Sequence, residues 1–139
     1  MTTHSASSSQ HQTLQLLAGT VRAIDSVLPG NAEIVLHDLR NPEYSIAAIA
    51  NAHVTGRKQG DSVLAGMRTD KAFKDVLTRV LEPISLIMDY STLTKDGVKL
   101  RSSTAIYRDN EGIAFAAMCI NVDDAGIDNA IWVLQQLGS

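Results

Sequence analysis

The chain has 139 residues, of which 45% are hydrophobic and 19% are charged, a composition that predicts one folded domain with a single core. Its formal net charge of -3 at pH 7 argues against a general polyanion-binding surface, which needs clustered Lys and Arg, so we expect no direct nucleic-acid binding by this chain. The single cysteine excludes an internal disulfide framework and a multi-cysteine zinc site. The N-terminus lacks the features of a signal peptide, and no apolar run approaches the ~18 residues of a membrane helix, so we expect a soluble, cytoplasmic protein without membrane contact.

The first third of the chain is predicted to form a helix followed by a two-stranded hairpin. Residues 1–11 are mainly Ser, Thr, His and Gln, too polar to be buried, and we expect a disordered tail there. Apolar residues then recur at three- and four-residue spacing over 13–28, which predicts an amphipathic helix that a Pro-Gly pair ends. Residues 32–38 form a predicted strand, and residues 45–52 form the strand that returns after an Asn-Pro turn.

The rest of the chain is predicted to form a helix, three strands and a last helix. Residues 69–82 carry Phe73, Val76, Leu77 and Val80 on one helical face, and Pro83 ends that helix. Asp-Gly and Asn-Glu-Gly turns, which supply the positive φ of hairpins, join the three strands that follow: 84–92, 98–109 and 113–123. Asp123 or Asp124 can cap the last helix, AGIDNAIWVLQQL, whose apolar side carries Ile127, Ile131, Trp132 and Leu134. The order of elements predicts an α+β fold, a five-stranded antiparallel sheet with flanking helices and one face covered by the middle helix.

Two segments carry a resemblance to a known family. NAHVTGRKQGD (51–61) and KDGVKLRSST (95–104) are similar to segments of the PAS domain of the YheO-like transcriptional regulators, and the similarity covers about Thr13 to Gln136. The resemblance implies a PAS fold, in which the concave face of the sheet and the helices enclose a small-molecule pocket, and it makes 12–139 a single PAS-like sensor domain. Members of this family usually carry a C-terminal helix-turn-helix and act as DNA-binding regulators, including repressors of amino-acid utilisation. No helix-turn-helix is expected in this chain, which ends at Ser139, so DNA binding is not carried over to it.

A polar loop follows the second predicted strand. Its glycines permit tight turns that point N–H groups at an anion, and Arg57 can bind a carboxylate or phosphate through two hydrogen bonds. Alternatively, Arg57 pairs with Asp61 or Glu33 and only fixes the loop. Asn51, His53 and Thr55 lie where the strand enters the loop, so they either contact a ligand or simply end the strand.

Strand alternation sorts the remaining polar residues. Glu33, Val35 and His37 share one face of their strand, and a buried His37 needs a partner: Glu33, Ser103, a backbone carbonyl or a ligand. Polar side chains on the later strands either line a pocket or bond across the sheet. The candidate ligand-binding residues are therefore His37, Asn51, His53, Thr55, Arg57, Ser103, Tyr107, Cys119 and Asn121.

Three functions compete. The leading hypothesis is a sensor that binds a small polar metabolite, an amino acid or another carboxylate, and signals through a homodimer, because PAS domains commonly pair through their N-terminal helices. The alternatives are a small enzyme, with His37 or His53 as general base oriented by Asp38 or Glu33, and a ligand-free protein-interaction domain. The sequence favours binding over catalysis. It carries no compact metal-ligand spacing and no haem or flavin motif, so no cofactor or metal is expected.

Overall fold

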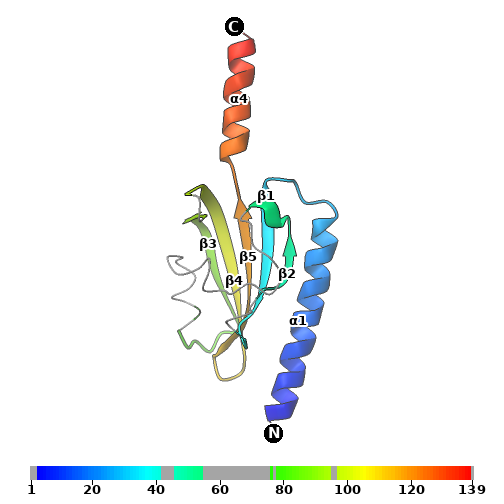
Figure 1. Ribbon diagram of the computed structural model, residues 1–139. Coiled ribbons are helices and arrows are strands. Elements are labelled where there is room, and N and C mark those ends of the chain that lie inside the picture. The colour runs from blue at the N-terminus through cyan, green and yellow to red at the C-terminus, as the bar shows by residue number, and fades with distance from the viewer. Residues whose placement is uncertain (1–2, 42–45, 55–75, 77, 95–96, 139) are drawn as a thin grey trace.

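The computed structural model describes residues 3–41, 46–54, 76, 78–94 and 97–138 of the chain. Its elements run in this order along the chain (Figure 1): α1 (Thr3–Asp25), β1 (Ala32–Asp38), β2 (Ile46–Ala50), the 3-10 turn η2 (Ala52–Val54), β3 (Ile84–Leu93), β4 (Lys99–Arg108), β5 (Ala114–Val122) and α4 (Ala125–Leu137). The predicted strands agree with these bounds to within two residues. The structure thus confirms the predicted α+β fold.

The five strands form one antiparallel sheet in the order β2-β1-β5-β4-β3. β5, the last strand in the chain, is therefore the central strand, between β1 and β4. Directly paired residues project from the same face of a sheet. The register places Asn121 opposite Glu33 of β1 on one side and opposite Ser102 of β4 on the other.

The two faces of the sheet bury different residues. On the outer face, α1 lies along β1 and β2 (Figure 1), where its Leu14 and Val21 pack against Ile34 and Leu36. The inner face is the opposite one, and carries Glu33, Val35 and His37. A second apolar cluster lies there, formed by Ile87, Ile106, Ala117 and Cys119 with Val76 packed against it. Val76 belongs to the predicted middle helix, most of which lies outside the described residues.

Helix α1 begins earlier than the sequence predicted. The segment 1–11 was expected to be a disordered tail, but the structure is helical from Thr3. Short polar side chains bond within the helix itself, as Thr13 Oγ1 does to the carbonyl of Ser9 at 3.1 Å. Nucleation is the unfavourable step in helix formation, so a helix that packing fixes around Leu14 and Val21 can propagate from there towards Thr3.

The middle helix ends before the position predicted from Pro83. Residues 78–83 contain no helix, although the pattern placed Val80 on a helical face. The N–H of Val80 donates instead to the carbonyl of Gly112 in the β4–β5 turn, at 3.2 Å. A tertiary hydrogen bond thus replaces a helical one, and periodicity alone cannot anticipate it.

Helix α4 stands clear of the sheet (Figure 1). Its bounds match the prediction, and Asp123 Oδ1 accepts from the N–H of Ala125 at 3.0 Å. None of its residues is buried, and its large apolar side chains are exposed: Ile127, Ile131, Trp132, Val133, Leu134 and Leu137. The described part of the chain therefore leaves an apolar helix surface uncovered. None of the described helices combines the length and hydropathy needed to cross a membrane.

Candidate functional site

The inner face carries a row of hydrogen-bonded polar side chains from four strands. Asn121 Nδ2 donates to Glu33 Oε1 at 2.9 Å, and Asn121 Oδ1 accepts from Ser102 Oγ at 2.7 Å. Ser102 Oγ also pairs with Thr92 Oγ1 at 2.8 Å. We call Glu33, Asn121, Ser102 and Thr92 the Asn121 rung. Its first three members are buried, so the amide of Asn121 uses both its donor and its acceptor inside the protein.

A second polar row lies one step further along the same face. Tyr90 Oη pairs with Thr104 Oγ1 at 2.5 Å, and Thr104 Oγ1 donates to Cys119 Sγ at 3.3 Å. Cys119 lies opposite Val35 of β1 in the register. The two candidates on β5, Cys119 and Asn121, therefore lie on one face, as alternation predicted.

His37 is fully buried on the same face. It lies opposite Ala117 of β5, one step beyond Val35. The structure therefore brings three of the sequence candidates, His37, Cys119 and Asn121, to the inner face. Sequence reasoning did not place Ser102, Thr104 or Tyr90 in this group, because their side of β4 and β3 becomes known only with the strand register.

Ser103 and Tyr107 lie on the opposite, outer face. Ser103 Oγ accepts from the N–H of Asp89 at 3.0 Å, where β3 carries a bulge and Asp89 has a φ of 54°. Tyr107 packs against the cluster under α1, and burial raises the pKa of its hydroxyl. The structure thus does not bring these two candidates together with His37, and it removes Ser103 from the partners expected for that histidine.

Asn51 ends β2 and holds the entry of β1. Its side-chain Nδ2 donates to the carbonyls of Pro29 and Ala32, both at 2.9 Å, and its φ is 57°, a value that Asn tolerates better than most residues. Both amide hydrogens are thereby used within the protein. The side chain of His53 and all of Thr55 and Arg57 lie outside the described residues.

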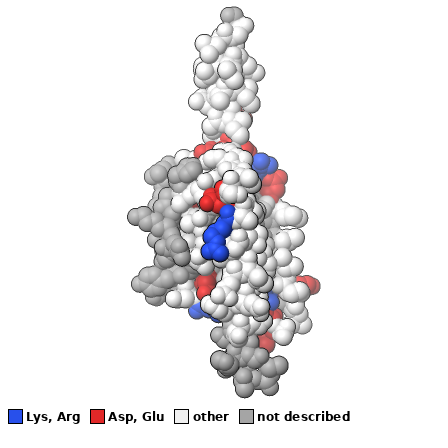
Figure 2. All heavy atoms as spheres, turned by 90° about the vertical axis from the view of Figure 1, so that its right-hand side faces the viewer, with Lys and Arg blue, Asp and Glu red and all other residues white. Residues whose placement is uncertain are grey.

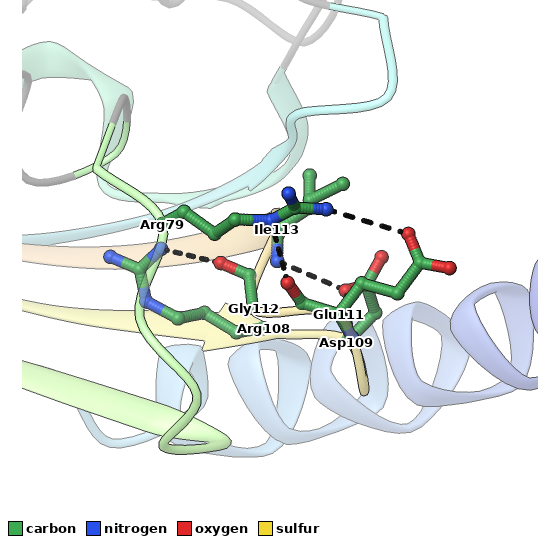
Figure 3. A network of polar contacts seen from close by, with 6 residues as sticks. All are labelled: Arg79, Arg108, Asp109, Glu111, Gly112 and Ile113. Atoms are coloured by element: carbon green, nitrogen blue, oxygen red, sulfur yellow. Dashed lines mark hydrogen bonds and ion pairs between the residues drawn. The ribbon is translucent and has the colours of Figure 1, made fainter.

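The β4–β5 turn binds the segment that precedes β3 (Figure 3). Buried Arg108 donates to the carbonyls of Thr78 and Gly112 and, at 3.2 Å, to Ser85 Oγ. Arg79 Nε reaches the carbonyl of Glu111 at 2.8 Å. Asp109 Oδ1 accepts from the N–H groups of residues 111 and 113 and closes the turn. The sequence indicated only a hairpin turn here, since nothing in RDNEG predicts a distant partner.

Charged side chains lie mainly at the ends of the sheet. An open groove of about 360 Å³ lies between β3, β4 and the start of α4, and the ion pair between Arg101 Nε and Asp124 Oδ2, at 3.1 Å, lies along its wall. At the end of β1, burial raises the pKa of Asp38, but the hydrogen bonds and charge of Arg40 outweigh burial and hold that pKa below its ordinary value. Within the described ranges, no three His, Cys, Asp or Glu side chains gather into a possible metal site.

Comparison with curated proteins identifies two relatives. The transcriptional regulator DauR of Pseudomonas aeruginosa is 32% identical over 124 residues, which are 89% of this chain and 53% of that protein. An uncharacterized protein of Haemophilus influenzae is 31% identical over 103 residues, 74% of this chain and 43% of that protein. The chain thus spans about half the length of these relatives.

Solved structures and a family profile complete the comparison. The PAS domain of a Colwellia psychrerythraea protein matches with a TM-score of 0.49 and 20% identity, over 78% of this chain and 96% of that one. The dark structure of the blue-light photoreceptor Aureochrome1 LOV matches with a TM-score of 0.46 and 15% identity, over 75% and 83%. The profile of the YheO-like PAS domain matches residues 8–139. Because this match takes in nearly the whole sequence, including every strand of the sheet, the chain belongs to the YheO-like PAS domain family.

Proposed function

We propose that the chain is a cytoplasmic sensor module of a transcriptional regulator, which binds a small polar or carboxylate metabolite such as an amino acid at the inner face and signals through a homodimer. Membership in the YheO-like family and similarity to the regulator DauR support the regulatory role. One observation carries the ligand part: the buried polar residues gather on the inner face. Five of the six buried polar residues in the described part of the chain lie there: Glu33, His37, Ser102, Thr104 and Asn121; the sixth is Arg108 at the end of β4.

The chemistry of these groups favours a polar ligand. A buried polar group costs free energy unless it is hydrogen-bonded, so even when these side chains bond to one another a face built only for packing gains little from five of them. A ligand pocket needs a few placed donors and acceptors within an apolar lining. The inner face offers a carboxylate, an amide, an imidazole and hydroxyls beside Ile106 and Ala117, which suits a small molecule with several hydrogen-bonding groups.

A thermal-shift screen tests ligand binding. The panel contains amino acids of both hands, keto acids, purines and phosphorylated metabolites. A ligand at ~100 times its dissociation constant adds about 2.7 kcal/mol to the free energy of unfolding, which raises the Tm by several degrees. We expect one chemical class to produce this shift. A stable protein that no class shifts would contradict the sensor proposal and favour a ligand-free interaction domain.

Two variants locate the binding site. Thr104→Val removes an inner-face hydroxyl at nearly constant volume, whereas Ser103→Ala removes the neighbouring hydroxyl on the outer face. We expect the ligand-induced shift to fall in Thr104→Val and to persist in Ser103→Ala. An Arg57→Ala variant tests the predicted anion-binding loop in the same screen. Equal shifts in the Thr104→Val variant and the unmodified protein would place the ligand away from this face.

The exposed side of α4 supports the dimer. Ile127, Ile131 and Leu134 follow a four-three spacing along the helix and are 47%, 49% and 67% exposed. This spacing is that of a coiled-coil seam, in which a second copy covers the same stripe. Asp128 in the first turn is the one charged residue of α4, and in Figure 2 the surface of the helix that faces the viewer carries no charged side chain above its base.

Sedimentation of two α4 variants tests the dimer. Ile131→Glu places a charge in the stripe, and Asn129→Glu places the same charge on the opposite side of the helix. We expect Ile131→Glu to shift the protein to monomer and Asn129→Glu to leave the dimer intact. A dimer that survives Ile131→Glu would show that α4 is not its interface.

We propose no direct nucleic-acid contact by the described residues. The net charge of the chain is -3, and Figure 2 shows acidic and basic side chains intermixed without a broad basic patch on that face.

A further inference from the structure

We infer that a second pair of copies of this chain packs against α4, so that four α4 helices form one bundle and the protein is a tetramer. The inference rests on the proposed function, because it adds a second interface to the helix that is proposed to form the dimer. The surface in question is a second apolar stripe beside the dimer stripe of Ile127, Ile131 and Leu134. We define this second stripe by its three exposed residues: Ala130, Val133 and Leu137.

The apolar surface of α4 is wider than one partner helix covers. Successive residues of a helix are about 100° apart around its axis, so the two stripes together span about 160° of the circumference. A two-stranded coiled coil buries only the narrow seam of positions a and d. The four-three spacing of the dimer stripe places Ile131 at a, with Ile127 and Leu134 at d. Val133 and Leu137, which are 41% and 78% exposed, lie outside that seam.

Two further observations favour four helices over two. Isoleucine at both a and d shifts coiled coils towards assemblies of three or four strands. A standard protein–protein interface also takes roughly 20–30 residues from each partner, whereas α4 has 13 residues and a two-stranded seam uses three of them. Covering the second stripe as well increases the apolar surface that each helix buries on assembly.

The sheet of the same chain does not cover the second stripe. Helix α4 points away from the sheet (Figure 1), and none of its residues is buried. At 1.5 Å per residue, Val133 and Leu137 lie about 12 Å and 18 Å along the helix axis from Ala125. The helix also contains no Lys or Arg, the residues with which amphipathic helices bind a membrane surface. Another copy of α4 is therefore the apolar partner that fits.

Charge indicates how the two pairs of helices meet. Asp128, near the base, is the one charged residue of α4, so four parallel helices would gather four carboxylates at one end of the bundle. Two antiparallel pairs place two carboxylates at each end, which lowers their repulsion. This arrangement also closes with D2 symmetry, the commonest symmetry of tetramers.

Sedimentation of the whole chain and of matched variants tests the tetramer. Val133→Glu places a charge in the second stripe, and Gln135→Glu places the same charge on the other side of the helix. Glutamate favours a helix more than valine does, so Val133→Glu should fold, which circular dichroism checks. We expect the unmodified protein and Gln135→Glu to sediment with the mass of four copies, and Val133→Glu with the mass of two copies or fewer. Leu137→Glu, on the same stripe, should behave like Val133→Glu.

The outcomes separate the tetramer from the proposed dimer. A protein that is no larger than a dimer at any concentration, or a tetramer that survives both Val133→Glu and Leu137→Glu, would overturn this inference. If such a dimer dissociates in Ile131→Glu, the proposed dimer stands without the tetramer. If Val133→Glu dissociates the tetramer and Ile131→Glu does not, the second stripe is an interface and the proposed dimer seam is wrong.

Discussion

Gly112 is the position where a single added methyl group should be most damaging. Its φ is 82°, and a Cβ atom there would lie 2.5 Å from the carbonyl oxygen of Val80 and 3.2 Å from Cγ of Arg79. Gly97 has the same φ of 82°, but a Cβ atom there would meet nothing within 4 Å. The substitutions Gly112→Ala and Gly97→Ala therefore share the backbone strain and differ only in the steric contact.

The structure allows the two costs to be separated. A non-glycine residue with left-handed backbone costs about 1–2 kcal/mol, which is the loss of unfolding free energy expected for Gly97→Ala. At Gly112 the contact with backbone atoms adds roughly 1–3 kcal/mol of overpacking. Movement of the turn to relieve it would also weaken the bonds that Val80 and Arg108 make to the Gly112 carbonyl.

Thermal and urea unfolding of both variants measures the difference. With roughly 4 °C of Tm per kcal/mol for a chain of this size, Gly97→Ala should lose about 4–8 °C and Gly112→Ala clearly more. The gain from a less flexible unfolded chain is the same in both variants and cancels. Equal losses would refute the reasoning, since they would mean that the turn does not pack tightly against Val80.

Three further predictions concern single side chains. The folded pKa of Asp38 lies below its ordinary value of 3.8, so its pairing with Arg40 stabilises the fold above that pH and is lost as the pH falls through the folded pKa. Asp38→Asn should therefore lower the stability to urea at neutral pH but not in strong acid. An equal loss of stability at both pH values would contradict the pairing. Asn51→Asp replaces the amide that donates to two carbonyls and should cost about 1–3 kcal/mol in urea unfolding, whereas unchanged stability would show those bonds to be dispensable. Cys119 is the only cysteine of the chain, is buried, and accepts a hydrogen bond from Thr104. A thiol reagent should therefore label the native protein only as fast as the protein opens locally. Immediate labelling would contradict the burial of Cys119.

The strands were predictable because alternation and turn chemistry are local. Gly97 and Gly112 both adopt the positive φ that their turns demanded, and each strand after them begins within one residue of its expected position. The helix ends were less predictable. The middle helix was extended to Pro83 on periodicity, yet the backbone of Val80 bonds to Gly112, 32 residues later. The start of α1 differed because the helix continues from its packed part towards Thr3, although the residues there are too polar to be buried.

The candidate site was only partly predictable, because side-chain faces depend on strand register. Alternation correctly grouped Glu33 with His37, and Cys119 with Asn121. It could not say which face of β4 joins them, and the candidates Ser103 and Tyr107 lie on the other face. Ser102 and Thr104 take their place because they pair directly with Asn121 and Cys119.

The two ends of the sheet differ in how firmly the chain holds them. At the β4–β5 turn, buried Arg108 binds two backbone carbonyls and a hydroxyl, so displacement there would leave a buried charge without its partners, at a cost of several kcal/mol. At the other end, no residue of α4 is buried, and among the described residues its base is held by the bonds of Asp123 and Asp124. Displacing the base of α4 therefore costs less than displacing the turn. The β4–β5 turn is therefore the fixed end of the sheet.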